Sequence, residues 1–310
     1  MTVRVSTAGS LKPVSYNPET GFKTVLAERC DASDTFHKRA GDMMNVQRLL
    51  RRAAAPVLTL LVLTSAAFTA QAQTVAEIVK KGRVTIGVVT GAPPFGTTDA
   101  TGKPAGYDVD VANLLGKYLG VPVDIVPLTS PSRIPALEAG KVDFLVATLA
   151  PTPERARAIM FSAPYSAFEL TIFAPVAAKY ARLTELGKKK VGVTRGTTQD
   201  TALTRLAVPG MNIVRFEDDA TCAQALISNQ VEAIALPNTT GNEIMKARGA
   251  GKFDAKFAFS VQPNSMAVRR DAFELRQWLN TTISYVKLNG ELDAIAQKWT
   301  GKALPALQAF

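Results

Sequence analysis

Two short stretches of the sequence carry side chains suited to holding an anion. The first is Thr152-Pro153-Glu154-Arg155, in which a cap residue, a first-turn proline and a first-turn acid predict a helix start beside the arginine. A guanidinium group can bind a carboxylate through two parallel hydrogen bonds. The second is Gly196-Thr197-Thr198, where hydroxyl and backbone N–H groups at a helix start favour negative charge. Arg155 could instead be an ordinary surface arginine, and the threonines an ordinary helix cap.

The segment 43–72 has the three parts of a secretory signal peptide. It begins with a basic region of three arginines, continues with 16 uncharged residues over 53–68, and ends at Ala70-Gln71-Ala72, a small-x-small cleavage pattern. The uncharged stretch is shorter than the roughly 20 residues that a membrane span needs. We therefore predict export to the periplasm, with Gln73 as the new N-terminus.

The position of this signal bears on the residues before it and on the chemistry available. A working N-terminal export signal has no polar segment upstream, so residues 1–42 are interpreted as a misassigned extension. His37 and Cys30 lie in that extension, which leaves the mature chain without histidine and with Cys222 alone. Cys222 lies in a helical pattern and is interpreted as a small buried hydrophobe. No disulfide, histidine triad, metal cage or cofactor is predicted.

The formal net charge of +10 is spread along the chain rather than gathered in one segment. Residues 73–310 hold 27 Lys and Arg against 21 Asp and Glu, a net charge of +6. The dense run among them, Lys188-Lys189-Lys190, precedes an apolar strand pattern and is interpreted as a solvated loop end. No basic stripe with interleaved aromatic residues is present, so no nucleic-acid partner is predicted.

The hydrophobic pattern predicts an α/β scaffold that positions these groups. Short β-branched runs alternate with amphipathic stretches, which is typical of βαβ units and a largely parallel sheet. The predicted strands cover 84–88, 123–126, 144–147, 191–193, 213–216 and 233–236. The predicted helices cover 109–119, 133–139, 152–159, 198–206, 221–227 and 242–247, with a helical tail at 271–286 and 291–300.

The alternation of strands and helices restarts once, which indicates two lobes of similar build. After 170–175, the run Lys190-Val191-Gly192-Val193 opens a second strand-turn-helix series. The strand-like Met266-Ala267-Val268 before the helical tail suggests that the chain then crosses back to the first lobe. Two crossings make a hinge, and a cleft between lobes joined in this way is a common place for a small ligand. The predicted division is lobe 1 at 73–172 and 264–310 and lobe 2 at 173–263.

Six motifs follow one another along the mature chain. They are Gly91-Ala92-Pro93-Pro94-Phe95, Gly106-Tyr107-Asp108-Val109-Asp110, the run 134–143, Thr152-Pro153-Glu154-Arg155-Ala156, Phe161-Ser162-Ala163-Pro164-Tyr165 and the run 191–198. Together they resemble the family 3 extracellular solute-binding proteins of the polar amino-acid type, which serve ATP-driven importers. The resemblance covers residues 75–301. It implies the type II periplasmic-binding-protein fold, in which two lobes, each a mainly parallel sheet flanked by helices, close around a ligand.

The resemblance also implies which residues meet the ligand. It matches Arg155 to the arginine that binds the ligand's carboxylate, and it places contacts from Thr148 and Ala150 beside that arginine. Thr197 and Thr198 supply contacts from the second lobe. The cap interpretation of these threonines is compatible with that role.

Three positions depart from the family pattern. An aspartate that takes the ligand's ammonium group commonly follows the strand 233–236, but this chain has Pro237 and then Asn238 there. The Asn238 amide oxygen could still accept a hydrogen bond. Ala92 and Ser130 stand where aromatic residues often sandwich the ligand, so that sandwich is not expected.

A second arginine, Arg133, lies in a run that matches a subgroup of the family, Thr129-Ser130-Pro131-Ser132-Arg133-Ile134-Pro135. A pocket with Arg133 and Arg155 and no ammonium-binding carboxylate would favour an anionic or polar ligand. If Arg133 points to solvent, that preference weakens. Phe95 and Tyr107 could line the cleft or pack in the core beneath the first strand.

The resemblance implies a periplasmic substrate-binding component of an ABC importer. It would bind a small carboxylate-bearing solute, an amino acid above all, and deliver it to an inner-membrane permease. We expect a monomer without enzymatic activity. Two alternatives stay open: a dehydratase of cyclic carboxylic acids on the same scaffold, with Glu169 near the hinge as candidate acid, and a protein that presents its ligand to a receptor.

Overall fold

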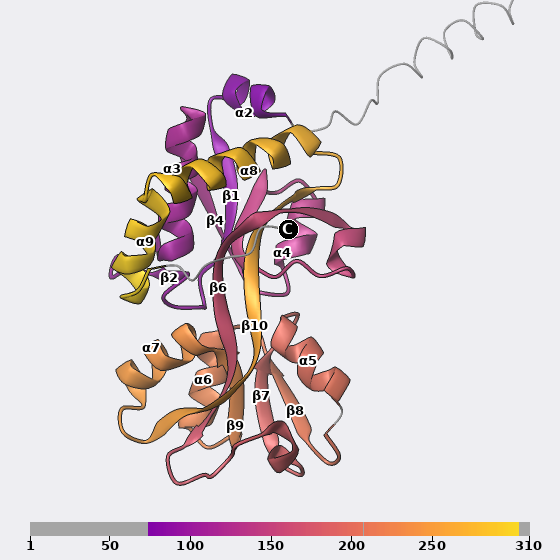
Figure 1. The fold of residues 1–310 in the computed structure, drawn as a ribbon, viewed down its shortest axis with the longest axis vertical. Helices are drawn as coiled ribbons and strands as arrows, with labels where there is room; N and C mark the ends of the chain where they lie inside the picture. The colour runs from indigo at the N-terminus through magenta and orange to yellow at the C-terminus, as the bar shows by residue number, and fades with distance from the viewer. Residues whose placement is uncertain (1–73, 207, 304–310) are drawn as a thin grey trace, which may run out of the picture. The chain divides into compact units, whose positions relative to one another are not determined.

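Figure 1 shows the fold of a computed structural model, which describes residues 74–206 and 208–303. The predicted signal peptide at 43–72 and the extension at 1–42 lie outside these residues. The strands are β1 (Val84–Val89), β2 (Thr97–Thr98), β3 (Pro104–Ala105), β4 (Val123–Leu128), β5 (Phe144–Leu149), β6 (Ile159–Pro175), β7 (Lys190–Thr194), β8 (Asn212–Phe216), β9 (Ala233–Pro237) and β10 (Phe253–Arg269). The helices are α2 (Val75–Lys81), α3 (Tyr107–Leu119), α4 (Arg133–Glu138), α5 (Thr198–Leu206), α6 (Asp219–Ile227), α7 (Asn238–Arg248), α8 (Phe273–Leu288) and α9 (Glu291–Thr300), with short 3-10 turns η1 (Arg155–Arg157) and η2 (Leu183–Leu186).

Two long strands join two groups of parallel strands into one mixed sheet. The strand order is β4-β1-β5-β10-β6-β9-β7-β8. In one group β1 pairs in parallel with β4 and β5, and in the other β7 pairs in parallel with β8 and β9. Between them β6 and β10, each 17 residues long, run antiparallel along their whole length. The chain therefore has a two-lobed α/β architecture in which both lobes are attached to the same two-stranded ribbon (Figure 1).

Helices cover both faces of each parallel group because successive side chains of a strand point to opposite sides. In the first lobe, Phe144 packs in a cluster with α3, α8 and α9, whereas its neighbour Leu145 packs on the other face with α4. In the second lobe, Ile234 packs with α6 and α7, and Ala235 packs with α5. Burial on both faces fixes the register of the strands and, with it, the positions of the loops at their carboxyl ends.

The six predicted strands are present, and each observed strand ends within two residues of its predicted bounds. The predicted helices at 198–206 and 291–300 have the predicted bounds, and the others except 152–159 are present with shifted ends. The α2 helix and the full lengths of β6 and β10 were not predicted.

The predicted helix at 152–159 is wrong. The cap signal itself is real, since the Arg155 N–H donates to the Thr152 hydroxyl at 3.3 Å and the Ala156 N–H to the Thr152 carbonyl at 2.9 Å. Only the three residues of η1 follow it, because Ile159 already pairs with Arg269 as the first residue of β6. Strand pairing with β10 therefore overrides the local helical preference.

Candidate ligand-binding site

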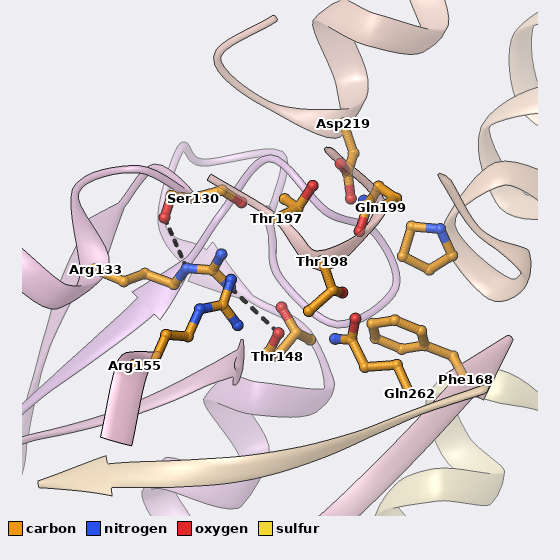
Figure 2. A pocket seen from close by; sticks show the side chains of 11 residues that line it. Ser130, Arg133, Thr148, Arg155, Phe168, Thr197, Thr198, Gln199, Asp219 and Gln262 are labelled. Atoms are coloured by element: carbon orange, nitrogen blue, oxygen red, sulfur yellow. Dashed lines mark hydrogen bonds between the residues drawn. The ribbon is translucent and has the colours of Figure 1, made fainter. Parts of the chain in front are cut away.

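A small cavity lies beside the β6–β10 ribbon, with side chains of both lobes in its walls (Figure 2). Its volume is about 20 Å³, enough for about one water molecule. Of the residues predicted for the site, Ser130, Arg133, Thr148, Arg155, Thr197 and Thr198 line it. The other lining residues, which the sequence analysis did not assign to the site, are Phe168, Gln199, Asp219, Pro237 and Gln262.

Arg155 bridges the two walls of this cavity. The η1 turn holds its backbone, and its Nη1 donates to the Ala150 carbonyl of the same lobe at 2.9 Å. Its Nη2 donates to the Gly196 carbonyl of the other lobe, also at 2.9 Å. Burial lowers the pKa of Arg155 below its usual value, but a guanidinium stays protonated in proteins. The group is therefore a fixed positive charge in the cavity, and it has the fork geometry that a carboxylate matches.

Arg133 also lies in the cavity wall, but its donors point at backbone carbonyls. The side chain is 3% exposed. Its Nε donates to the Ser130 carbonyl at 2.8 Å, and its Nη1 donates to the carbonyls of Ala147 at 2.9 Å and Thr148 at 3.2 Å. Its Nη2 lies 3.4 Å from the Gly196 carbonyl. Burial, with the nearby Arg155 charge, lowers the pKa of Arg133 to about 9. Arg133 thus connects the loop before α4, the carboxyl end of β5 and the turn before α5.

Thr148 has an unusual backbone conformation at the carboxyl end of β5. Its φ is +46°, in the left-handed region that β-branched residues rarely occupy. This turn brings the Thr148 carbonyl to Arg133 and directs the Thr148 N–H to the Tyr165 hydroxyl at 3.1 Å. The conformation costs about 1 to 2 kcal/mol, and the surrounding hydrogen bonds hold it in place.

A buried network behind Thr148 supports that turn. The Tyr165 hydroxyl donates to Asp108 Oδ1 at 2.7 Å, and the Tyr107 hydroxyl donates to the Tyr165 carbonyl at 3.0 Å. All three side chains are 0% exposed. Burial raises the pKa of Asp108 well above its usual value. Asp108 and Tyr165 both lie in motifs of the sequence, but their contact joins positions 57 residues apart and has no local signal.

The second lobe contributes the amino-terminal end of α5 to the cavity. The Thr197 hydroxyl donates to the Thr194 carbonyl at 2.6 Å and accepts from the Asp200 N–H at 3.3 Å, so Thr197 caps the helix. Thr198 differs, since its Oγ1 is buried without a hydrogen-bond partner among the described residues. Both threonines line the cavity. Thr197 therefore both caps α5 and lines the cavity, whereas Thr198 lines it without a cap bond.

Asp219 is a cavity residue that the sequence analysis missed. It is the first residue of α6, and its side chain is 5% exposed. The Thr194 hydroxyl donates to Asp219 Oδ1. Burial raises the pKa of Asp219 to about 6, while the Thr194 hydrogen bond and the Arg133 charge act in the opposite direction. The sequence does offer one signal for it. Asp218 and Asp219 are adjacent acids at the start of one helix, and a single acid suffices as the cap, so the second is available for another role.

The β6–β10 ribbon supplies the third wall through two directly paired residues, Phe168 and Gln262. The Gln262 Nε2 donates to Asn264 Oδ1 at 2.9 Å, and Asn264 Nδ2 donates to the Ser166 hydroxyl at 3.0 Å. Gln262 is 6% exposed, and its Oε1 has no hydrogen-bond partner among the described residues. An unsatisfied acceptor therefore belongs to the lining of the cavity.

Four predicted site residues lie outside the lining of this cavity. Ala150 contributes its carbonyl to Arg155. Phe95, Tyr107 and Asn238 line a larger cavity of about 670 Å³, which shares Phe168 with the small one. Phe95 and Tyr107 are also core residues, with ring centroids 5.5 Å apart.

Asn238 is bonded to the β6–β10 ribbon. Its Oδ1 accepts from the Glu169 N–H at 3.3 Å, and its Nδ2 donates to Glu169 Oε2 at 3.2 Å. Glu169 lines the larger cavity and is not among the residues that line the small one. Asn238 and Glu169 thus line a different cavity from the two arginines, although their neighbours Pro237 and Phe168 line the small one.

Comparison with known proteins identifies relatives of the chain. The pattern of the bacterial extracellular solute-binding proteins, family 3, matches residues 84–302. The L-cystine-binding protein TcyJ of Escherichia coli (strain K12) is 26% identical over 227 residues, which are 73% of this chain and 85% of that protein.

Two solved structures have the same fold. The solute receptor for L-cysteine of Neisseria gonorrhoeae superposes with a TM-score of 0.69 and 31% identity, over 73% of this chain and 93% of that one. An ancestral amino-acid-binding protein described as a precursor of cyclohexadienyl dehydratase superposes with a TM-score of 0.68 and 31% identity, over 74% of this chain and all of that one. The reported relatives are binding proteins.

Proposed function

Because the chain belongs to the bacterial extracellular solute-binding proteins, family 3, we propose that it is the substrate-binding component of an ABC importer for an amino acid. The observation that carries this proposal is the position of Arg155, whose guanidinium lies between the two lobes and donates to Gly196 across the cavity. A ligand carboxylate offers two charged oxygens to the same fork of donors. Binding there would connect the lobes through the ligand.

The proposed site is the small cavity around Arg155. Thr148, Ser130 and Arg133 form its first-lobe side, and Thr197 and Thr198 form its second-lobe side. Ala150 holds the Arg155 side chain. Phe95, Tyr107 and Asn238 line the neighbouring cavity. We propose that they contact the ligand only where its side chain is long enough to extend past Phe168.

Ligand entry would require the lobes to separate. An amino acid is several times larger than the one water molecule that 20 Å³ holds. The proposed hinge lies where β6 and β10 pass from lobe 1, at 73–172 and 264–310, to lobe 2, at 173–263. Rotation of one lobe about these two crossings would open the cavity without disturbing either core, as in other hinge proteins.

The proposed location is the periplasm and the proposed partner is an inner-membrane ABC permease. The predicted signal peptide at 43–72 supports export. No helix within residues 74–206 or 208–303 combines the length and the apolar character that crossing a bilayer requires. We propose that a single copy delivers the ligand, and we propose no catalytic step.

Titration of the purified exported protein with the twenty amino acids tests this function. We expect saturable binding of at least one amino acid and loss of that binding in Arg155→Ala. Arg157→Ala is the matched control, because Arg157 lies in the same η1 turn but is exposed and does not line the cavity. Absence of binding to every amino acid, or equal binding by wild type and Arg155→Ala, would contradict the proposal.

A further inference from the structure

The charges around the small cavity define what a ligand must carry. Three described lining residues are charged: Arg133, Arg155 and Asp219. Asp219 is the single carboxylate among them. A site that holds only the carboxylate of its ligand would need no acid in its wall, since a buried acid repels an anionic ligand.

The two arginines differ in how many of their N–H donors the fold already uses. Arg133 is 3% exposed and donates to four backbone carbonyls, those of Ser130, Ala147 and Thr148 in its own lobe and, at 3.4 Å, that of Gly196 in the other lobe. Arg155 makes two hydrogen bonds, one of them to the carbonyl across the cavity. The positive charge offered to a ligand is therefore that of Arg155, and Asp219 offers the balancing negative charge.

The fold itself does not use the Asp219 carboxylate fully. The preceding residue, Asp218, already caps α6, because its side chain accepts from the Thr221 N–H at 2.7 Å. Asp219 accepts one hydrogen bond, from the Thr194 hydroxyl, and the Arg133 charge acts on it without a direct ion pair among the described residues. A carboxylate has about four acceptor positions, and burying it without a directly bonded cation is costly. Asp219 therefore has capacity for a donor that the ligand brings.

Two further acceptors line the same cavity. Thr198 Oγ1 and Gln262 Oε1 are both buried without partners among the described residues. In Figure 2 Asp219 and Gln262 extend toward Thr198 from opposite sides. An ammonium group carries three N–H donors and no acceptor. One charged and two neutral acceptors, from α6, α5 and β10, match that requirement.

We propose that Asp219 is the specificity-determining residue that receives the ligand's α-ammonium group, with Thr198 and Gln262 as neutral acceptors. This rests on the proposed function and deepens it. The ligand class is then the zwitterionic amino acid, held by Arg155 at its carboxylate and by Asp219 at its ammonium. A carboxylate without an amino group brings no N–H donors, so the buried acceptors of Asp219, Thr198 and Gln262 stay without partners and the ligand binds weakly.

Paired ligands test this assignment. Wild type is first titrated with the twenty amino acids, and the amino acid that binds is then compared with its des-amino analogue, for example L-cysteine with 3-mercaptopropionate or L-glutamine with 4-carbamoylbutanoate. We expect the amino acid to bind at least about 10-fold more tightly than the analogue. In Asp219→Asn we expect amino-acid affinity to fall by about 10- to 100-fold while analogue affinity stays equal or rises.

Asp218→Asn is the matched control, because it removes the adjacent charge while asparagine still caps α6. Its affinities should match those of wild type. Melting temperatures without ligand show that each variant folds, and Asp219→Ser serves as a second variant. If wild type binds an amino acid and Asp219→Asn keeps the same preference over the analogue, the Asp219 assignment is wrong and the proposed function stands. If wild type binds none of the twenty amino acids, the proposed function fails, and the assignment fails with it.

Discussion

The guanidinium of Arg155 and the backbone carbonyl of Gly196 are hydrogen-bonded at 2.9 Å, although they belong to different lobes and are 41 residues apart in sequence. The bond joins η1 to the turn before α5, where Gly196 has a φ of +71°. A change in either group alters both the site and the contact between the lobes. Arg155 is therefore the first position to vary.

Replacing Arg155 with lysine keeps the charge and removes the fork. A lysine ammonium is a point charge that cannot bind a carboxylate through two parallel bonds. We expect Arg155→Lys to bind the amino-acid ligand about 10- to 100-fold more weakly, with a melting temperature near that of wild type. Calorimetric titration beside Arg157→Lys measures this. An affinity equal to that of wild type would show that charge alone suffices.

Arg133 is expected to matter for stability as well as for binding. Its buried side chain donates to carbonyls in the loop before α4, in strand β5 and in the turn before α5. Arg133→Met leaves those carbonyls without their donors and should lower the free energy of unfolding by about 2 to 4 kcal/mol. Arg83→Met is the control, since the Arg83 guanidinium lies 3.6 Å from Asp124 and is 61% exposed. That change should cost less than about 1 kcal/mol in urea unfolding.

The left-handed conformation of Thr148 predicts that glycine at this position is more stable than alanine, the reverse of the usual order. Alanine at 148 still suffers the positive φ, whereas glycine does not. Thr148→Gly should therefore be more stable than Thr148→Ala by about 1 kcal/mol. At the adjacent residue, whose φ is not positive, Ala147→Gly should instead destabilise by about 0.5 to 1 kcal/mol. Thermal unfolding of the three variants decides the matter, and Thr148→Ala equal to Thr148→Gly would refute it.

The raised pKa of Asp219 predicts how stability depends on pH. A folded-state pKa of about 6, against an ordinary value of 3.8, means that folding favours the protonated form. The contribution of this group is fully present below about pH 4 and is lost as the pH rises through 6. Asp219→Asn should therefore be more stable than wild type at pH 7.5 without ligand, by up to roughly 3 kcal/mol, and equal to it near pH 4. Melting curves from pH 4 to 8 test this, and a difference independent of pH would contradict it.

The parts of the site that could be predicted from the sequence are those encoded by local signals. The cap at Thr197 and the arginine after Thr152-Pro153-Glu154 are each readable within four residues, and both line the cavity. The role of Asp219 was not readable, because Asp218 explains the cap and the burial of its neighbour depends on packing against distant elements. The resemblance of the sequence to the family pattern pointed to Pro237 and Asn238 as the position of an ammonium-binding group. In the structure, the carboxylate that lines the small cavity is on α6.

The fold shows the same division between local and distant causes. The periodic pattern predicted the short parallel strands, of which β1 and β5 are buried on both faces and the edge strands β4 and β8 are partly exposed. It failed at 152–159, where a correct cap is followed by a strand instead of a helix. The partner that imposes this, β10, lies about a hundred residues further along the chain, and no local pattern announces it.

The Gly196 carbonyl has a consequence for which molecules can compete for Arg155. It accepts from Arg155 Nη2 at 2.9 Å and lies 3.4 Å from Arg133 Nη2, so an arriving group that takes the Arg155 Nη2 donor facing the second lobe competes with a peptide carbonyl for it. An ester, an amide or an internal peptide bond is no better an acceptor than the carbonyl it would replace, whereas a carboxylate forms shorter and stronger bonds. The Gly196 carbonyl thereby sets a minimum acceptor strength for ligands: a group must bond Arg155 more strongly than this carbonyl does, whatever its shape. Capped amino acids and peptide interiors fall below that threshold even where they would fit.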